Sequence, residues 1–157
     1  MDKLPKRLQI ALESDCAEEL NEIIRAHRKA DFELLRQLLS TNSQVDPRYR
    51  TRAIYALGRW GTERAVGDIL QVMPVLDERG RIAAMDSLGR LGSNQALQAI
   101  INYSDDPSSH VRKFAIHALG RFQLPEAKAK LIEIREKDPD EHLRNLASDY
   151  INRDQSE

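Results

Sequence analysis

Side chains that could carry catalysis or hold a metal are few in this chain and stand apart from one another. The single cysteine, Cys16, lies among acidic residues, which disfavour a reactive thiolate. The four histidines are His27, His110, His117 and His142, and no two of them are three or four residues apart. No helix can therefore present a pair of imidazoles to a metal ion. The sequence predicts no catalytic residue, no metal site and no cofactor.

One set of residue types could in principle form a catalytic triad. Tyr55, Asp86 and His117 follow one another at intervals of 31 residues. If each stands on its own helix, the three side chains are too far apart for a catalytic triad, because packed helices lie about 8–10 Å apart. We interpret this set as a polar row on an outer helix surface.

A short phrase that returns every 31 residues indicates the elements that position these side chains. It reads Leu-Gly-Arg and begins at Leu57, Leu88 and Leu119. A period of this size is typical of stacked helical hairpins. Apolar residues at helical spacing precede each copy (helix A), and a second apolar stripe follows it (helix B). One hairpin cannot bury both stripes alone, so neighbouring units must stack.

The glycine of the phrase is predicted to end helix A, because glycine adopts left-handed dihedrals without a steric clash. These glycines are Gly58, Gly89 and Gly120. The arginine that follows each glycine then lies at the negative end of the helix dipole, which stabilises the helix by about 0.3–1 kcal/mol. No Lys-Ser or Lys-Thr pair follows the glycines, so they are not expected to form a phosphate-binding loop.

The repeat predicts a single domain over residues 1–157. Its fold class is all-α, an α-solenoid of about ten helices that forms a right-handed superhelix. Residues 1–45 are expected to form a degenerate N-terminal unit, with an entry helix near Leu4–Leu12. Three repeats are predicted at 46–76, 77–106 and 107–138. A capping helix at 139–152 and a polar tail at 153–157 are expected to follow.

Charge and composition restrict the classes of function. The net charge of −1 disfavours a nucleic-acid binder, although residues 46–123 hold 11 basic against 8 acidic side chains. No apolar run approaches the roughly 20 residues that span a bilayer, and the amino terminus leads into no signal-like segment. A lone cysteine fits a reducing compartment. We therefore expect a cytoplasmic protein without a membrane segment.

The repeated residues resemble the HEAT-repeat family in the short variant first noted in phycobilisome lyases. The variant's pattern, an acidic residue followed by Val-Arg-x-x-Ala-x-x-Ala-Leu-Gly, is best matched between Ser109 and Gly120. The resemblance covers residues 46–151 well and the first 45 loosely. It implies that helices A form the convex side of the solenoid and that helices B line a concave, partner-binding side.

The resemblance also implies a structural ladder of arginines that pair with acidic residues at the turns between repeats. Its members are Arg50, Arg81, Arg112 and Arg144. Asp46 and Asp77 lie four residues before the first two, a spacing that is worth about 0.3–0.5 kcal/mol on an exposed helix. Asp106 and Asp138 lie six residues before the last two, so the pairing there is less local. An arginine stripe that binds phosphates is the alternative. We favour the structural interpretation, since a tie between repeats requires an arginine at one fixed repeat position.

The exposed flank of helices B is predicted to be the partner-binding site. It is polar, mixed in sign and centred on amides, which both donate and accept hydrogen bonds and so suit a protein surface. The candidate residues are Arg64, Asp68, Gln71, Gln95, Gln98, Asn102, Lys130 and Glu133.

Three functions remain open at this point. The first is a non-enzymatic scaffold that binds a protein partner through the concave face, as a monomer or a weak homo-oligomer. The second, implied by the resemblance, is a bilin lyase or another chromophore-handling factor. The third is a HEAT-like nucleic-acid binder, which the ten arginines of residues 46–123 favour and the net charge opposes.

Overall fold

The computed structural model describes residues 4–14, 17–40 and 45–153. Within these ranges the chain forms ten α-helices, one short 3-10 helix and no strand. The elements are α1 (Lys6–Glu13), α2 (Ala17–Ala26), α3 (Lys29–Gln37), α4 (Pro47–Trp60), α5 (Arg64–Val72), η1 (Met73–Val75), α6 (Glu78–Leu91), α7 (Asn94–Tyr103), α8 (Ser109–Leu119), α9 (Pro125–Lys137) and α10 (Glu141–Arg153). The prediction of an all-α solenoid with about ten helices is confirmed.

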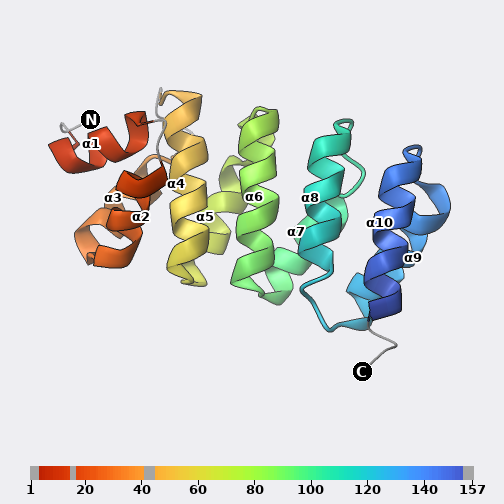
Figure 1. Ribbon diagram of the computed structural model, residues 1–157. Helices are drawn as coiled ribbons and strands as arrows, with labels where there is room; N and C mark the ends of the chain where they lie inside the picture. Colours follow the sequence, from red (N-terminus) through yellow and green to blue (C-terminus); the bar gives the residue numbers. More distant parts are fainter. Residues whose placement is uncertain (1–3, 15–16, 41–44, 154–157) are drawn as a thin grey trace.

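The helices form two layers that run along the molecule (Figure 1). Helices α4, α6, α8 and α10 stand side by side in one layer, called the A layer below. Helices α5, α7 and α9 lie behind them as the B layer. The short helices α1, α2 and α3 gather at the N-terminal end, and the two chain ends lie at opposite ends of the stack. Each predicted repeat range contains one helix of each layer.

The core follows from the repeat period. In each A-layer helix of the three repeats, the same alanine, the next apolar residue and the same leucine have no exposed surface. These residues are Ala53, Ile54 and Leu57 in α4, Ala84, Met85 and Leu88 in α6, and Ala115, Ile116 and Leu119 in α8. Equivalent positions in α5, α7 and α9 complete one continuous cluster. The seam between the layers is therefore built from the apolar stripes that the sequence repeats.

Local side chains set the helix boundaries. The side chains of Asp46, Asp77, Ser93 and Ser108 each accept a hydrogen bond from a backbone N–H in the first turn of the following helix. This satisfies donors that have no partner inside the helix.

The glycines of the Leu-Gly-Arg phrase correct the predicted helix ends. Gly58 and Gly89 lie inside α4 and α6, which continue for two more residues and are capped by the following Gly61 and Gly92. The latter two have φ of 74° and 69°, a left-handed conformation that glycine adopts without strain. Gly120 does follow α8, but in a right-handed conformation.

The glycines of the phrase instead allow close contact between neighbouring A-layer helices. A Cβ atom on Gly58 would lie 2.4 Å from the Cβ of Ser87, and one on Gly89 would lie 2.8 Å from the Cβ of Ala118. A Cβ on Gly120 would lie 2.2 Å from a ring carbon of Tyr150. Glycine is thus required at these positions by packing, and this requirement recurs with the repeat.

The N-terminal helices pack on the first repeat. Helix α1 contacts both α2 and α4, and the Phe32 and His27 rings pack against Trp60 at the end of α4. An ion pair between Arg7 and the buried Asp31 joins α1 to α3. Cys16 and residues 154–157 of the predicted tail lie outside the described residues, whereas Arg153 belongs to α10.

Candidate functional site

The amide side chains of the predicted site form one exposed group on the B layer. Gln71 lies near the end of α5, and Gln95, Gln98 and Asn102 share one face of α7 through their helical spacing. All four are exposed, and none of their side chains makes a hydrogen bond to another described residue. This amide group (Gln71, Gln95, Gln98 and Asn102) therefore keeps its donors and acceptors available to a partner.

The charged residues predicted beside the amide group are occupied within the chain. Arg64 Nη1 lies 3.5 Å from the Glu33 carboxylate. Asp68 accepts two hydrogen bonds from Arg36, which extends from α3. These pairs connect α5 to α3, so both residues contribute to contacts within the protein.

Lys130 departs from the predicted exposed position. It is 9% exposed and equivalent in the repeat to Ala99, which is 8% exposed, because this position of the B-layer helix turns toward the core. Its Nζ lies 3.1 Å from Asp105 and 3.2 Å from Glu133. Burial by itself lowers the pKa of Lys130, but the hydrogen bonds to the two carboxylates outweigh it and raise the pKa. Lys130 is therefore a charged anchor between α9 and the α7–α8 turn.

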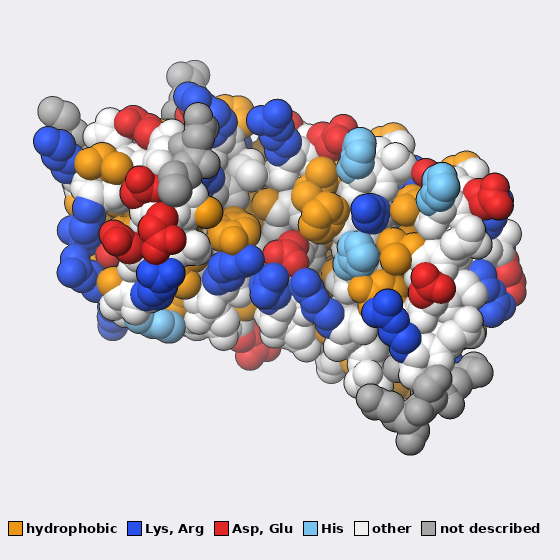
Figure 2. Space-filling view, in the orientation of Figure 1, with side chains coloured by type: hydrophobic (Ala, Val, Ile, Leu, Met, Phe, Trp, Pro, Cys, Tyr) orange, Lys and Arg blue, Asp and Glu red, His pale blue; other side chains and the backbone are white. Residues whose placement is uncertain are grey.

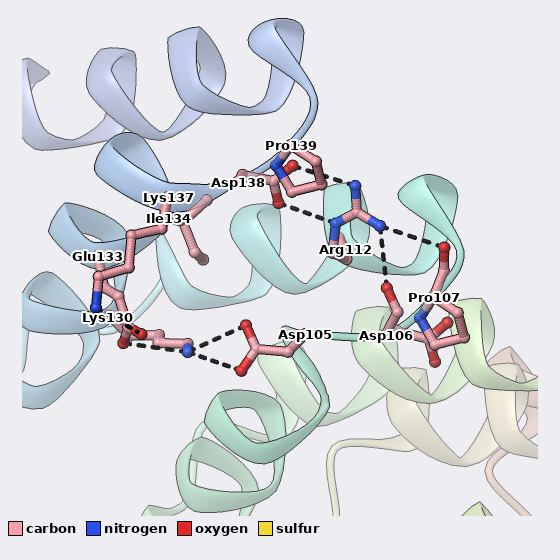
Figure 3. Close-up of a pocket in the computed structure, with 10 residues that line it drawn as sticks. All are labelled: Asp105, Asp106, Pro107, Arg112, Lys130, Glu133, Ile134, Lys137, Asp138 and Pro139. Carbon is pink, nitrogen blue, oxygen red and sulfur yellow. Dashed lines mark hydrogen bonds and ion pairs between the residues drawn. The ribbon is translucent and has the colours of Figure 1, made fainter.

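A cavity of about 340 Å³ adjoins this anchor, between the α7–α8 turn and the α9–α10 turn (Figure 3). Lys130 and Asp105 pair along one side of it, and Arg112 and Asp138 pair along the other. Its charged groups thus largely neutralise one another, and no lining residue is a cysteine, serine or histidine nucleophile or base. The described residues also contain no cluster of His, Cys, Asp or Glu side chains that could hold a metal ion.

Two of the predicted ladder arginines pair with aspartates from the following turn. Arg81 donates from Nε and Nη2 to the Asp106 carboxylate at 2.7 and 3.2 Å. Arg112 donates to Asp138 in the same two-pronged way, at 2.9 and 3.1 Å. Both arginines also donate to backbone carbonyls of the turn that precedes their own helix. Each guanidinium therefore connects two successive inter-repeat turns.

The other two ladder arginines are placed differently. Arg144 donates to the backbone carbonyl of Asp138 at 2.6 Å, and Arg50 is half-buried at the equivalent position of α4. The expected pairing with an aspartate four residues earlier is wrong for Arg81, because Asp77 caps α6 and Asp106 holds the guanidinium.

The carboxylates of Asp106 and Asp138 bind the arginine of the preceding repeat, whereas the arginine six residues later binds only their backbone carbonyls. Both precede a proline, and the Asp-Pro pair returns after 32 residues, close to the repeat period. Proline ends one unit, so a carboxylate just before it is held at a fixed point of these two turns.

No hydrogen bond, ion pair or ring contact joins Tyr55, Asp86 and His117 to one another in the described structure. Tyr55 lies under the guanidinium of Arg59, Asp86 binds arginines, and His117 shares a hydrogen bond of 2.8 Å with the Tyr150 hydroxyl. Each of the three side chains is thus engaged with a different partner.

The layered helical hairpins define an α-solenoid, a class of protein in which each unit contacts mainly its neighbours. The sequence matches the family described as HEAT repeats over residues 69–151. The chain belongs to the HEAT-repeat family. This confirms the resemblance that the repeated arginine, alanine and glycine positions indicate.

A solved structure has a similar fold. It is the complex of CpcE and CpcF of phycocyanin lyase from Nostoc sp. PCC7120, and it is 18% identical to this chain with a TM-score of 0.50. The match covers 94% of this chain and 79% of that chain. No curated protein matches the sequence. None of the helices in the described ranges is long and apolar enough to cross a membrane.

Proposed function

We propose that this protein is a protein-interaction module that binds a segment of a partner protein on the amide group of the B layer. The observation that carries the proposal is the contrast between two kinds of polar residue on that surface. Arg64, Asp68 and Lys130 are engaged in pairs inside the chain, while the four amides are exposed and have no internal partner.

The chemistry of an amide side chain suits a polypeptide partner. An amide donates two hydrogen bonds and accepts two, and a peptide backbone offers both N–H donors and C=O acceptors. A phosphate backbone only accepts, so it would leave the amide oxygens without partners. The overall charge of −1 also gives no long-range attraction for nucleic acid.

Two further observations support a protein partner. The solenoid places α5 and α7 side by side in one layer, so their exposed faces form a continuous surface. The similar solved structure is itself a complex of two proteins. Interfaces of this kind are stabilised by a few well-placed contacts rather than by the whole area.

The test is an affinity capture with the purified protein, followed by mass spectrometry. The site variant changes Gln95, Gln98 and Asn102 together to alanine, and it should lose the partner that the wild type retains. The control variant changes Gln37, Gln123 and Asn145 to alanine, three exposed amides outside the B-layer face. Equal recovery of the partner by both variants would remove the amide group from the proposal.

Chromophore handling is a second candidate, and the fold similarity to phycocyanin lyase supports it. A bilin bound by the protein should change its visible absorption spectrum, because its conformation and protonation respond to a binding pocket. An unchanged spectrum after mixing the protein with a bilin at micromolar concentration would exclude this candidate.

A further inference from the structure

Three arginines of the Leu-Gly-Arg phrase converge on one carboxylate of the A layer. Arg90 Nε donates to Asp86 Oδ2 at 3.0 Å, and Arg121 Nη2 donates to Asp86 Oδ1 at 2.9 Å. Arg121 also donates to the Asp86 backbone carbonyl at 3.0 Å. Arg59 Nη1 lies 3.6 Å from the same carboxylate, too far for a hydrogen bond.

One carboxylate cannot neutralise three guanidinium groups. Burial by itself raises the pKa of Asp86, but the hydrogen bonds from Arg90 and Arg121 lower it, so Asp86 is ionised at neutral pH. The cluster then holds three positive charges and one negative charge. Arg59 Nη1 is buried and makes no hydrogen bond in the described structure. The cluster is therefore short of acceptors as well as of negative charge.

The positive charge extends along the A layer to the C-terminal end. Arg153 occupies the fourth copy of this repeat position, at the end of α10, where its guanidinium lies 5.3 Å from the centre of the Tyr150 ring. We call Arg59, Arg90, Arg121 and Arg153 the arginine row. Figure 2 shows Lys and Arg side chains in a line across this face, with isolated acidic groups between them.

The cations of this face also affect the pKa of His117. His117 lies on α8, four residues before Arg121 of the arginine row. Its pKa is lowered first by burial and then by the nearby cations Lys113, Arg121 and Arg153. Asp86 acts in the opposite direction but does not offset them.

An apolar line accompanies the arginine row on α6, α8 and α10, about two helical turns before each arginine, whereas the equivalent residue of α4 is Arg52. It consists of half-buried side chains that pack on the edge of the core, namely Ala83, Phe114 and Leu146. Beside Ala83 lies a hollow of about 300 Å³, lined by Ala17, Leu20, Thr51, Arg52, Tyr55 and Ala83. Figure 2 shows hydrophobic side chains gathered between the helices of this face.

We propose that the arginine row binds an extended acidic segment of a protein, with its carboxylates on the arginines and apolar side chains toward the apolar line. The spacing of the row suits such a segment. Neighbouring helices lie about 8–10 Å apart, and an extended chain in the polyproline II conformation advances about 3.1 Å per residue and turns the same side outward at every third residue. A carboxylate at every third residue would therefore meet successive arginines.

The same geometry disfavours a nucleic acid on this face. Duplex DNA carries one charge per about 1.7 Å of its axis, which is far denser than one arginine per helix. Asp86 lies within the arginine row, and the exposed Asp149 lies one turn before Arg153, so both would repel a continuous phosphate backbone. The apolar line would find no counterpart on such a backbone.

The test uses a fluorescein-labelled peptide of twelve residues, with glutamate at every third position and alanine or leucine between. Its binding is followed by fluorescence anisotropy at low and moderate salt. The first variant changes Arg90 and Arg121 to glutamine, and the second changes Arg59 and Arg153 to glutamine. The second leaves both hydrogen bonds to Asp86 in place, so it remains informative if the first variant does not fold.

The control variant changes Arg48 and Arg79 to glutamine. These exposed residues lie at the N-terminal ends of α4 and α6, the same helices that carry Arg59 and Arg90 near their C-terminal ends. The peptide should bind about tenfold more weakly to each row variant, and nearly as well to the control as to the wild type. The amide-group variant of the B layer should bind it unchanged, which separates this site from the proposed function.

Three results would overturn the proposal. One is a peptide that does not change anisotropy even at low salt. Another is a control variant that weakens binding as much as the row variants, which would indicate attraction by charge alone. The third is tighter binding of a single-stranded twelve-nucleotide DNA than of the peptide.

Discussion

Two sets of arginines recur with the same repeat period in this protein, and they differ in how their charge is met. Arg81 and Arg112 each have a carboxylate of their own, supplied by the next inter-repeat turn. Arg59, Arg90 and Arg121 share Asp86 alone. A repeated arginine is therefore not in itself a structural tie or a binding site. The number of acceptors within reach decides which it is.

The two sets of arginines also differ in burial, and the set with its own carboxylates is the more buried one. The Arg112 and Asp138 side chains are 11% and 4% exposed, so the loss of one partner would leave the other charge poorly solvated. The side chains of Arg90 and Arg121 are 39% and 37% exposed, and water screens their interactions. The first set is therefore expected to govern stability and the second to govern binding.

The largest loss of stability is expected from removing Arg112, whose side chain is buried against Asp138. Arg112→Ala should lower the free energy of unfolding by about 3–5 kcal/mol, because Asp138 would keep only the backbone N–H of Asp140 as a donor. The measurement is urea unfolding followed by circular dichroism. Arg121→Ala, the matched change in the other set, should cost no more than about 1 kcal/mol. Similar losses of stability in the two variants would contradict the inference that Arg112 stabilises the fold more than Arg121 does.

A smaller loss of stability is expected from a change in the contact between α6 and α8, which sets the spacing of Arg90 and Arg121. Gly89→Ala should destabilise the protein by about 1–3 kcal/mol, because the new methyl group would push α6 away from Ala118 on α8. Gly67→Ala is the control, since a Cβ at Gly67 meets no atom within 4 Å. That change should stabilise α5 by about 0.5–1 kcal/mol. Thermal or urea unfolding of both variants checks the opposite signs.

The smallest effect is a pH dependence at the edge of the arginine row. Because the pKa of His117 is lowered in the folded protein, the unfolded chain binds the proton more tightly. Its contribution to stability is therefore lost as the pH falls below the ordinary value of 6.5, until the folded-state pKa is passed.

Arg121→Gln should reduce this dependence, because it removes one of the cations that oppose protonation of His117. Urea unfolding at pH 7.5 and at pH 5 compares the two proteins, with His117→Gln as the reference that lacks the group. An equal pH dependence in the wild type and the His117→Gln variant would show that other groups produce it.

Much of the fold is predictable from the sequence because its causes are local. The 31-residue period, the apolar stripes around Leu57 and Leu88, and the cap at Ser93 depend on residues a few positions apart. The prediction failed where a residue had two possible uses. Gly58 could end a helix or allow a close approach, and only the position of Ser87 on the next helix decides between them.

The candidate sites were less predictable, because their composition depends on distant parts of the chain. The four amides of the B layer could be chosen from helical spacing, but the engagement of Arg64 and Asp68 depends on α3, which lies about one repeat earlier. Likewise, the arginines of the phrase were expected to act on their own helix ends. The structure brings three of them to Asp86 instead, through the stacking of α4, α6 and the end of α8.

The sequence by itself therefore determined that this chain is a stack of helical hairpins, since a periodic apolar pattern admits few other ways to exclude water. Tertiary structure alone decided which carboxylate each arginine meets. Asp77 is nearer than Asp106 to Arg81 in the sequence, yet it caps α6, and the distant aspartate takes its place. The physical reason is that a cap requires only one turn of helix, whereas a partner across two turns exists only after the repeats have stacked.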